Sequence, residues 1–453
     1  MSPPKPAGRA ARVSLWRYAS LFRRDILSAQ PDRLYRAWMA EFRTPFFRSF
    51  LINQPDLVRA VLNERPMDFP KSERVGAGLR PLLGNSVFLS NGETWLRQRR
   101  IIEPAFAGGR LRETFPAMRD AAEAAVARLK PGAVEVEEAA SFAAADVIFR
   151  TLFSIPIEDR VAARVFAAFR AYQRAQPILN PAALLPLARW MPRVHRREAR
   201  MAAREIRRLI EELVAERARA IAAGTAPDDL ATKIMTTVDP VTGARLPPDE
   251  MVDQVAIFFL AGHETSAAAL AWGLYLLALY PEAQARVAAE AAGFDGEFSS
   301  LARLRFTRDV FRETLRLYPP VPMMVRETTR QERFRDRAVP RGAQVVISPW
   351  HLHRQNRLWE RPDAFDPDRF QTENGQARLR DAFIPFSSGK RVCTGAGFAM
   401  AEGVVLLATL VRAFRFERIA GCDPVPVAHL TVRARDGIHL RVTPRAAVDL
   451  AAE

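Results

Sequence analysis

The sequence predicts a mainly helical protein with a smaller β-rich lobe. Residues 110–240 form successive amphipathic segments rich in alanine, arginine and leucine, which is typical of helices that each bury one face. Residues 251–280 form a long apolar segment that ends before a proline and predicts a buried central helix. Near the C-terminus, alternating apolar residues flank Asp436 and Gly437, and this pattern predicts a β-hairpin.

Composition excludes several classes of protein. The chain has 453 residues and is 49% hydrophobic, which is enough for a large core and excludes a disordered protein. Its net charge is +16, and arginine supplies nearly all of the excess because only five residues are lysine. Such a chain could attract nucleic acid, an anionic membrane or an acidic protein. The arginines are scattered and no nucleic-acid motif accompanies them, so we expect no nucleic acid and favour an acidic protein partner. A general arginine bias is the alternative.

Residues 1–30 are expected to form a flexible leader ahead of the folded part. From Met1 to Arg24 the chain has six basic residues and no acidic one, a composition that fits a cytosolic leader or a mitochondrial transit peptide. This stretch contains no apolar run of about 18 residues, so we expect no N-terminal transmembrane anchor. Cys393 and Cys422 lie in different contexts and predict a reducing compartment without disulfides.

The elements before residue 107 are expected in this order: a helix from Asp32, a strand over 47–52, a helix from Pro55, a loop over 70–91 and a basic helix over 92–106. In the basic helix, Trp95 and Arg99 lie one turn apart on one face, where two groups can share one anionic ligand. A solvated basic face is the simpler interpretation of Arg97 and Arg100.

The central apolar segment carries His263, Glu264 and Thr265 in its middle. It is long enough to span a bilayer, but a charge at the centre of a lone transmembrane helix costs roughly 2.5–3.5 kcal/mol. We therefore expect a helix buried in protein. An acid beside a hydroxyl can carry protons in a site, and polar packing between helices is the alternative interpretation.

Residues 386–395, Phe-Ser-Ser-Gly-Lys-Arg-Val-Cys-Thr-Gly, combine turn-forming and basic residues around Cys393. A tight turn here can aim backbone N–H groups at one sulfur and stabilise a thiolate, which suits a metal. A buried, unreactive cysteine is the alternative. Upstream, Glu313 and Arg316 lie at i, i+3 on one helix before a Pro-Pro stop, and Arg369 follows in a turn rich in proline and aspartate.

The segment around Cys393 resembles the haem-ligand pattern Phe-x-x-Gly-x-Arg-x-Cys-x-Gly of the cytochrome P450 family, with all five fixed positions filled. Residues 261–266, Ala-Gly-His-Glu-Thr-Ser, resemble the family's oxygen-activating pattern. The resemblance covers about residues 30–445 and implies one catalytic domain of two lobes, residues 31–453, with haem between the long central helix and the Cys393 loop. In this family the cysteine thiolate binds the haem iron and favours O–O cleavage.

The resemblance also implies roles for single residues. Cys393 would be the metal ligand, Thr265 a proton donor to bound oxygen and Glu264 a proton relay. The implied cofactor-binding residues are Trp95, Arg99, Ala261, Gly262, Arg326, Phe386, Arg391, Gly395 and Ala399, with Arg99, Arg326 and Arg391 at the two haem propionates. The implied structural charge triad is Glu313, Arg316 and Arg369. The pocket candidates are Val321, Met323 and Met324, with the apolar residues 177–192 as a lid over the pocket. Packing of a connecting segment is an equally good explanation of residues 177–192.

The implied reaction inserts one oxygen atom from O2 into a small apolar substrate. It needs haem b, and NAD(P)H takes part only indirectly, because the chain has no flavin or iron–sulfur motif and electrons must come from a ferredoxin and ferredoxin reductase or an equivalent. We expect a monomer in the bacterial cytoplasm, with mitochondrial import as the alternative. A peroxide-driven peroxygenase or isomerase on the same fold, and a non-catalytic haem-binding sensor, are the alternative functions.

Overall fold

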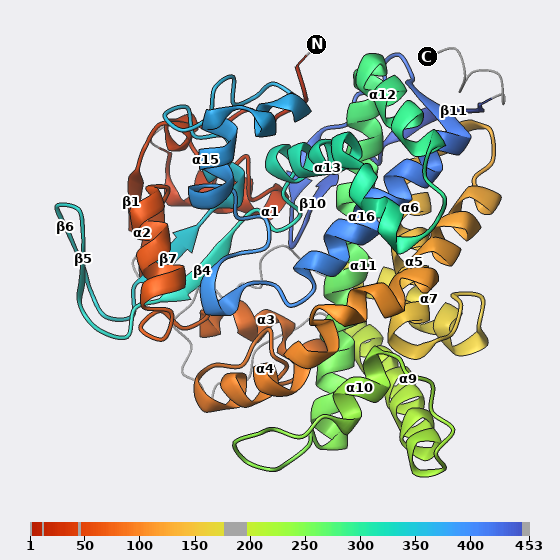
Figure 1. The fold of residues 1–453 in the computed structure, drawn as a ribbon. Coiled ribbons are helices and arrows are strands. Elements are labelled where there is room, and N and C mark those ends of the chain that lie inside the picture. The colour runs from red at the N-terminus through yellow and green to blue at the C-terminus, as the bar shows by residue number, and fades with distance from the viewer. Residues whose placement is uncertain (1, 11–12, 44–46, 176–196, 446–453) are drawn as a thin grey trace.

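The computed structural model describes residues 2–10, 13–43, 47–175 and 197–445. Figure 1 shows helices filling most of the molecule and the largest sheet on one side. The α-helices are α1 (Leu15–Arg24), α2 (Pro55–Arg59), α3 (Glu73–Leu83), α4 (Gly92–Phe106), α5 (Gly109–Arg128), α6 (Val136–Phe153), α7 (Arg160–Ala175), α9 (Arg197–Ala222), α10 (Leu230–Thr236), α11 (Pro248–Leu279), α12 (Pro281–Ala292), α13 (Arg305–Leu317), α14 (Pro349–Leu352), α15 (Glu373–Asp381) and α16 (Ala396–Ala413). The predicted mainly helical fold with a smaller β-rich lobe is confirmed.

The strands form small sheets. They are β1 (Met39–Arg43), β2 (Arg48–Ile52), β3 (Gly132–Glu135), β4 (Met324–Glu327), β5 (Glu332–Phe334), β6 (Arg337–Val339), β7 (Gln344–Ile347), β8 (Phe414–Arg418), β9 (Pro426–Ala428), β10 (Val432–Ala434) and β11 (His439–Pro444). The largest sheet has four strands in the order β1-β2-β7-β4, in which only β2 and β7 pair in parallel. Strand β4 brings residue 326 to the edge of this sheet.

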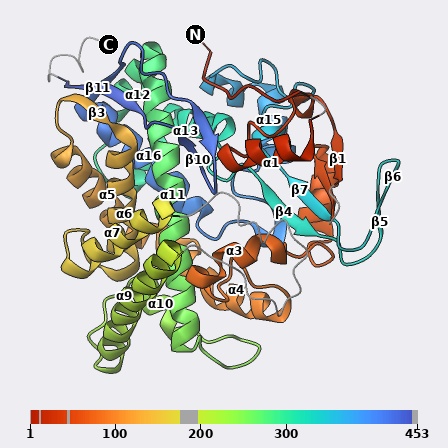
Figure 2. The same cartoon turned by 180° about the vertical axis from the view of Figure 1, so that it is seen from behind.

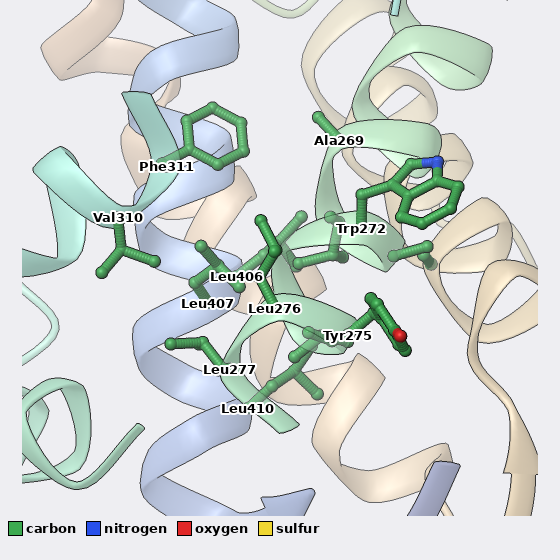
Figure 3. Close-up of a cluster of buried hydrophobic side chains, with 14 of the residues drawn as sticks. Ala269, Trp272, Tyr275, Leu276, Leu277, Val310, Phe311, Leu406, Leu407 and Leu410 are labelled. Carbon is green, nitrogen blue, oxygen red and sulfur yellow. The ribbon is translucent and has the colours of Figure 1, made fainter. Parts of the chain in front are cut away.

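Helix α11 is the long central helix that the sequence predicts. Pro248 opens it with Asp249 and Glu250 in the first turn, where carboxylates favour the helix dipole, and it ends before Pro281. Because most of its residues are buried, its apolar character extends around the whole helix. In its C-terminal half, Leu276 and Leu277 lie beside leucine side chains of α16, as Figure 3 shows, while the ring of Trp272 on the other side stacks on Tyr318 with centroids 4.0 Å apart. This packing fixes α11 relative to the helix that follows Cys393.

Helices α11 and α16 are both long and apolar enough to cross a membrane by composition, although 78% and 61% of their most apolar windows are buried inside the protein. The sequence predicts one segment of this length and apolar character, and the described residues contain two. The burial of α11 is consistent with the expectation that it lies in the protein core.

The predicted C-terminal hairpin is wrong. Strands β10 and β11 do flank Gly437, whose φ is +78°, but they do not pair with each other. Instead β10 pairs with β9, and β11 lies between β3 and β8 in a three-stranded sheet. Asp436 and Gly437 do separate the two strands as predicted, but each strand pairs with strands from other parts of the chain.

The predicted loop over 70–91 contains helix α3. Leu79, Leu82 and Leu83 are buried in the cluster that includes α9 and α11 side chains. Burial of this apolar face outweighs the poor helix propensity of Gly76 and Pro81. Upstream, the expected first helix is reduced to one 3-10 turn, Asp32–Tyr35, and the chain continues into β1.

The described part of residues 1–30 lies against the rest of the protein, where the sequence predicts a flexible leader. The Lys5 ammonium group is 2.7 Å from the Asp363 carboxylate, and Tyr318 donates a hydrogen bond to the Pro4 carbonyl. The Asp25 carboxylate accepts the Ala428 N–H at 2.7 Å. These contacts join the first 30 residues to the folded domain.

Candidate active site

The Cys393 loop is a tight turn braced from outside. The Cys393 N–H donates to the Phe386 carbonyl at 2.9 Å and closes the turn. Gly389 has a φ of +64°, and a Cβ there would lie 2.3 Å from the Leu62 carbonyl oxygen, so only glycine fits. Ser387 also has a positive φ, +63°, which costs energy for a side chain and is typical of functional loops.

The sulfur of Cys393 is accessible although the loop is deep in the protein. Burial raises the pKa of the Cys393 thiol, while the Gly395 N–H and the Arg99 charge act in the opposite direction. The predicted help from backbone N–H groups is present but is weaker than the effect of burial. On the central helix, Ala261 is also exposed, between the buried Leu260 and the half-buried Gly262. The Cys393 loop and the middle of α11 therefore each carry a solvent-accessible residue.

The polar side chains in the middle of α11 form hydrogen bonds within the helix and to other segments of the chain. The Thr265 hydroxyl donates to the Ala261 carbonyl at 2.5 Å and is half-exposed. The Glu264 carboxylate is buried; it accepts the Thr431 hydroxyl at 2.6 Å and pairs with Arg433 at 3.1 Å. Gln173 of α7 donates to its other oxygen at 3.1 Å. Glu264 is thus held by groups from two other segments of the chain.

His263 and Gly262 serve packing. The imidazole of His263 is 2.6 Å from the Ser141 hydroxyl, and burial lowers its pKa to about 3, so it is neutral. A Cβ on Gly262 would lie 2.3 Å from the Ile148 Cδ1, because α6 approaches closely there. The glycine therefore allows close contact of α11 with α6, and its predicted contact with the cofactor stays a prediction.

A buried carboxyl group links α11 to α16. Ser266 donates to Glu402 at 2.7 Å, and Glu402 is 1% exposed. Burial raises the pKa of Glu402 to about 8, and its second oxygen has no partner among the described residues. Glu402 lies six residues into α16, about 9 Å along the helix from the end that follows Cys393. This bond therefore joins the middle of α11 to the first turns of α16, the helix that follows the Cys393 loop.

Cationic side chains gather around Trp95 of α4. The Arg391 guanidinium lies 4.3 Å from the centroid of the Trp95 ring. The Arg99 guanidinium and the Lys71 ammonium group lie 5.9 and 5.7 Å from the same centroid. The Arg99 guanidinium also donates to the Val392 carbonyl at 2.8 Å, which ties α4 to the Cys393 loop. The structure thus brings Trp95, Arg99 and Arg391 together.

Arg326 of β4 completes this cationic cluster. It is 7% exposed and its Nε has no partner among the described residues. Burial and the charge of Arg391 lower the pKa of Arg326 to about 10. Burial and the charge of Arg99 likewise lower the pKa of Arg391 to about 10. Desolvation lowers the pKa of Lys71 well below its usual value, helped by the same arginines. Mutual repulsion of this kind requires an anion for compensation.

The cationic cluster, Lys71, Arg99, Arg326 and Arg391, fits the two propionates of haem. The only carboxylate paired with it among the described residues is Glu103, which bonds Arg99 from the exposed side. At Gly395 a Cβ would meet no atom within 4 Å, so there is open space beside the cysteine. An accessible cysteine, open space at Gly395 and a cluster of four cations with one paired carboxylate among the described residues together suit a flat, dianionic cofactor.

Glu313, Arg316 and Arg369 are brought together in the interior. Two parallel hydrogen bonds of 2.8 Å join the Arg316 guanidinium to the Glu313 carboxylate, and Arg369 Nε donates to the same carboxylate at 2.9 Å. Arg316 also donates to the carbonyls of His353, Pro362 and Ala364. The three side chains hold the segment over 353–369 against α13.

The remaining predicted cofactor and pocket residues lie in different parts of the protein. Phe386 and Ala399 are half-buried, and Phe386 packs against the main hydrophobic core. Val321, Met323 and Met324 are half-buried, and Met324 packs against the apolar cluster under the largest sheet. The proposed lid, residues 177–192, lies outside the residues that the structure describes.

Sequence reasoning missed Lys71, Arg433 and Glu402. Lys71 offered one signal, since it is a rare lysine in an arginine-rich chain and stands in a segment interpreted as a loop. Arg433 belongs to a strand far from Glu264 in sequence, and nothing local indicates their contact. Glu402 lies inside an apolar helix, where a lone acidic residue indicates a buried polar contact.

Comparison with known proteins agrees with this geometry. The family model described as Cytochrome P450 matches residues 36–441. Cyclooctat-9-en-7-ol 5-monooxygenase of Streptomyces melanosporofaciens is 33% identical over 398 residues, which cover 84% of this chain and 83% of that protein. Cyclooctatin synthase of the same organism is 32% identical, with 85% and 84% covered. Cytokinin hydroxylase of Arabidopsis thaliana is 28% identical, with 87% and 78% covered.

The match extends over most of the chain and includes helix α11 and the Cys393 loop. Proteins of this family use haem, O2 and electrons from a redox partner, and the relatives are named as monooxygenases and hydroxylases. The chain therefore belongs to the cytochrome P450 family and is a haem-thiolate monooxygenase.

Proposed function

We propose that this monooxygenase binds haem b through Cys393 and hydroxylates a small apolar substrate. The observation that carries the proposal is the cationic cluster beside the accessible cysteine, because four buried or half-buried cations need an anionic cofactor. Cys393 would ligate the metal, and Lys71, Arg99, Arg326 and Arg391 would hold the propionates. When bound, the haem supplies the iron at which O2 is activated for insertion of one oxygen atom into a C–H bond.

Glu264 and Thr265 are proposed to move protons in this site. The Glu264 carboxylate reaches solvent through Arg433, whose side chain is 37% exposed. A proton taken up at Glu264 Oε1 can move inward once the carboxylate releases Arg433 or Thr431. Thr265 is half-exposed, and its Oγ1 would pass on the proton. Ala261, Phe386, Gly395 and Ala399 would border the cofactor.

The pocket walls are proposed to include Val321, Met323 and Met324. Their apolar side chains favour an apolar substrate, and the relatives are named for oxidation of cyclooctat-9-en-7-ol and of cytokinin. Glu313, Arg316 and Arg369 are proposed to maintain the fold around the haem and to take no part in the chemistry. Residues 31–453 would form one domain around one haem, as a monomer in the bacterial cytoplasm.

A ferredoxin with its reductase is the proposed electron source, and NADH or NADPH would act only through the reductase. The net charge of +16 and the exposed Lys390 beside the Cys393 loop support docking of an acidic protein. Turnover with a ferredoxin system should fall as ionic strength rises from about 0.01 to 0.15 M, because salt screens this attraction. A rate that does not change with salt would contradict electrostatic docking.

The carbon monoxide difference spectrum of the reduced protein tests the metal ligand. The wild type and Cys422→Ala are expected to give the strongly red-shifted Soret band of thiolate-ligated haem, and Cys393→Ala is expected to lose it. A spectrum typical of histidine ligation in the wild type, or an unchanged band in Cys393→Ala, would contradict the proposal. A parallel assay with hydrogen peroxide alone should support less turnover than O2 with reduced ferredoxin; the reverse result would identify a peroxygenase.

A further inference from the structure

The outward face of helix α1 has an unusual composition for a protein surface. Trp16 is 88% exposed, the highest value among the large apolar side chains that the structure describes as exposed. Ser20, Arg23 and Arg24 follow at i+4, i+7 and i+8 on the same face, with Arg17 beside them. A single exposed apolar side chain is common on protein surfaces, but an exposed indole set among arginines on one helix face forms an amphipathic surface.

The arginines of this face are uncompensated. The side chains of Arg17, Arg23 and Arg24 are exposed and form no ion pair with any residue that the structure describes. Elsewhere in the described chain, many arginines pair with aspartate or glutamate. Over residues 1–40 the sequence has eight basic residues and two acidic ones. Of these two, Asp25 is buried and accepts backbone N–H groups from Leu27, Ser28 and Ala428.

Helix α1 is fixed on the body of the protein, so its outward face is presented rigidly. The rings of Tyr18 and Phe22, on the other face, contact each other with centroids 5.8 Å apart. Directly after the helix, the Ile26 N–H donates to the Ala428 carbonyl of β9 at 3.0 Å. Figure 2 shows α1, in red, on the near side of the molecule beside β10. The face needs no folding step before it meets a partner.

We propose that this face of α1 docks on an anionic phospholipid bilayer. Indole suits the boundary between headgroups and acyl chains because its body is apolar and its N–H is polar. Guanidinium groups pair with phosphates in a fork geometry, and each basic residue near an anionic leaflet adds attraction. Nucleic acid would satisfy the arginines but would leave the tryptophan unexplained, since no other exposed aromatic or base-reading motif accompanies it on α1.

The location of α1 gives the docking a consequence. Strand β9 bonds the end of α1, and its partner β10 contains Arg433, which pairs with Glu264 in the site. The side of the molecule that carries the C-terminal strands would thus face the bilayer. An apolar substrate dissolved in lipid would then be concentrated near the enzyme rather than in the surrounding water.

Vesicle binding by the purified holoenzyme tests the proposal. The probes are large unilamellar vesicles of phosphatidylcholine alone and of phosphatidylcholine with phosphatidylglycerol. We expect co-sedimentation only with the anionic vesicles, weaker at high salt, and a blue shift of tryptophan emission that Trp16→Phe abolishes. Replacing Arg17, Arg23 and Arg24 by glutamine should weaken partitioning at least about tenfold.

A charge-matched control separates α1 from the total charge. Replacing Arg245, Arg305 and Arg341 by glutamine removes the same charge from exposed positions outside α1 and should leave binding unchanged. Equal loss in both triple variants, absence of binding to anionic vesicles, or an emission spectrum that does not respond would each overturn the proposal. Binding of a DNA oligonucleotide that depends on α1, without vesicle binding, would also overturn it. The carbon monoxide spectrum should be unchanged in all variants, so this test is independent of the haem site.

Discussion

Lys71 and Glu402 are buried ionisable residues whose pKa values shift in opposite directions for the same reason. Burial penalises the charged form, so it lowers the pKa of the lysine and raises that of the glutamate. Three neighbouring arginines add to the effect on Lys71, whereas Ser266 gives Glu402 only one hydrogen bond. Each residue therefore makes stability or cofactor binding depend on its protonation.

Glu402 predicts a loss of stability as pH rises. The pKa of its folded form, about 8, lies above the usual glutamate value of 4.5, so the unfolded chain releases this proton first. The free energy of unfolding should therefore fall through the range from pH 4.5 to 8 and stay level above it, with at most about 1.4 kcal/mol lost per pH unit.

Urea unfolding at pH 5 and pH 8 measures this effect. Glu402→Gln keeps the neutral shape and the Ser266 contact, so the variant should match the wild type at pH 5 and exceed it at pH 8. An equal pH dependence in both proteins would show that Glu402 is not the group responsible.

Lys71 predicts a trade-off between cofactor retention and stability of the apoprotein. Lys71→Met removes one cation of the cluster, so haem should dissociate about tenfold faster, as expected for the loss of a charged hydrogen bond. The same change should stabilise the apoprotein, because the repulsion from Arg391 and Arg326 disappears. Transfer of haem to apomyoglobin and urea unfolding of the apoprotein measure the two effects. Lys130→Ala, on the exposed surface, is the control and should change neither.

The contact of α11 with α6 depends on a glycine. Gly262→Ala would place a Cβ 2.3 Å from Ile148 and should destabilise the protein by about 1–3 kcal/mol. Because the clash is with one side chain, Ile148→Ala in the same chain should recover part of the loss, as a double-mutant cycle would measure. Gly78→Ala in α3 meets no atom within 4 Å and should be neutral or stabilising. Additive effects of the substitutions at 262 and 148 would contradict the close helix contact.

The Glu313 carboxylate joins distant parts of the chain. It bonds Arg316 on its own helix and Arg369 beyond β7, and both arginines reach the carbonyl of Ala364. Glu313→Gln would leave two buried guanidinium groups without a counter-charge and should cost about 3–5 kcal/mol in the free energy of unfolding. The surface pair Arg286–Asp368 is the control, and Asp368→Asn should change stability by less than about 1 kcal/mol. A small effect of Glu313→Gln would show that the triad is dispensable for the fold.

Much of the active site could be predicted because its residues lie in short local patterns. The turn at Cys393 occupies residues 386–395 and the polar centre of α11 residues 261–266, so their side chains and backbone preferences act over one to three turns. Trp95 and Arg99 are one helical turn apart, so their common face follows from helix geometry alone. The helical fold class also follows from local periodicity.

What the sequence determined by itself is therefore the helical character, the turn positions and the identity of the local motifs. Only the tertiary structure decided which strands pair across Gly437, that α3 is a helix, and that Lys71, Arg433 and Glu402 meet the site. These features depend on contacts between residues far apart in the chain. Their stability comes from burial and charge between segments, and neither propensity nor periodicity within one segment contains that information.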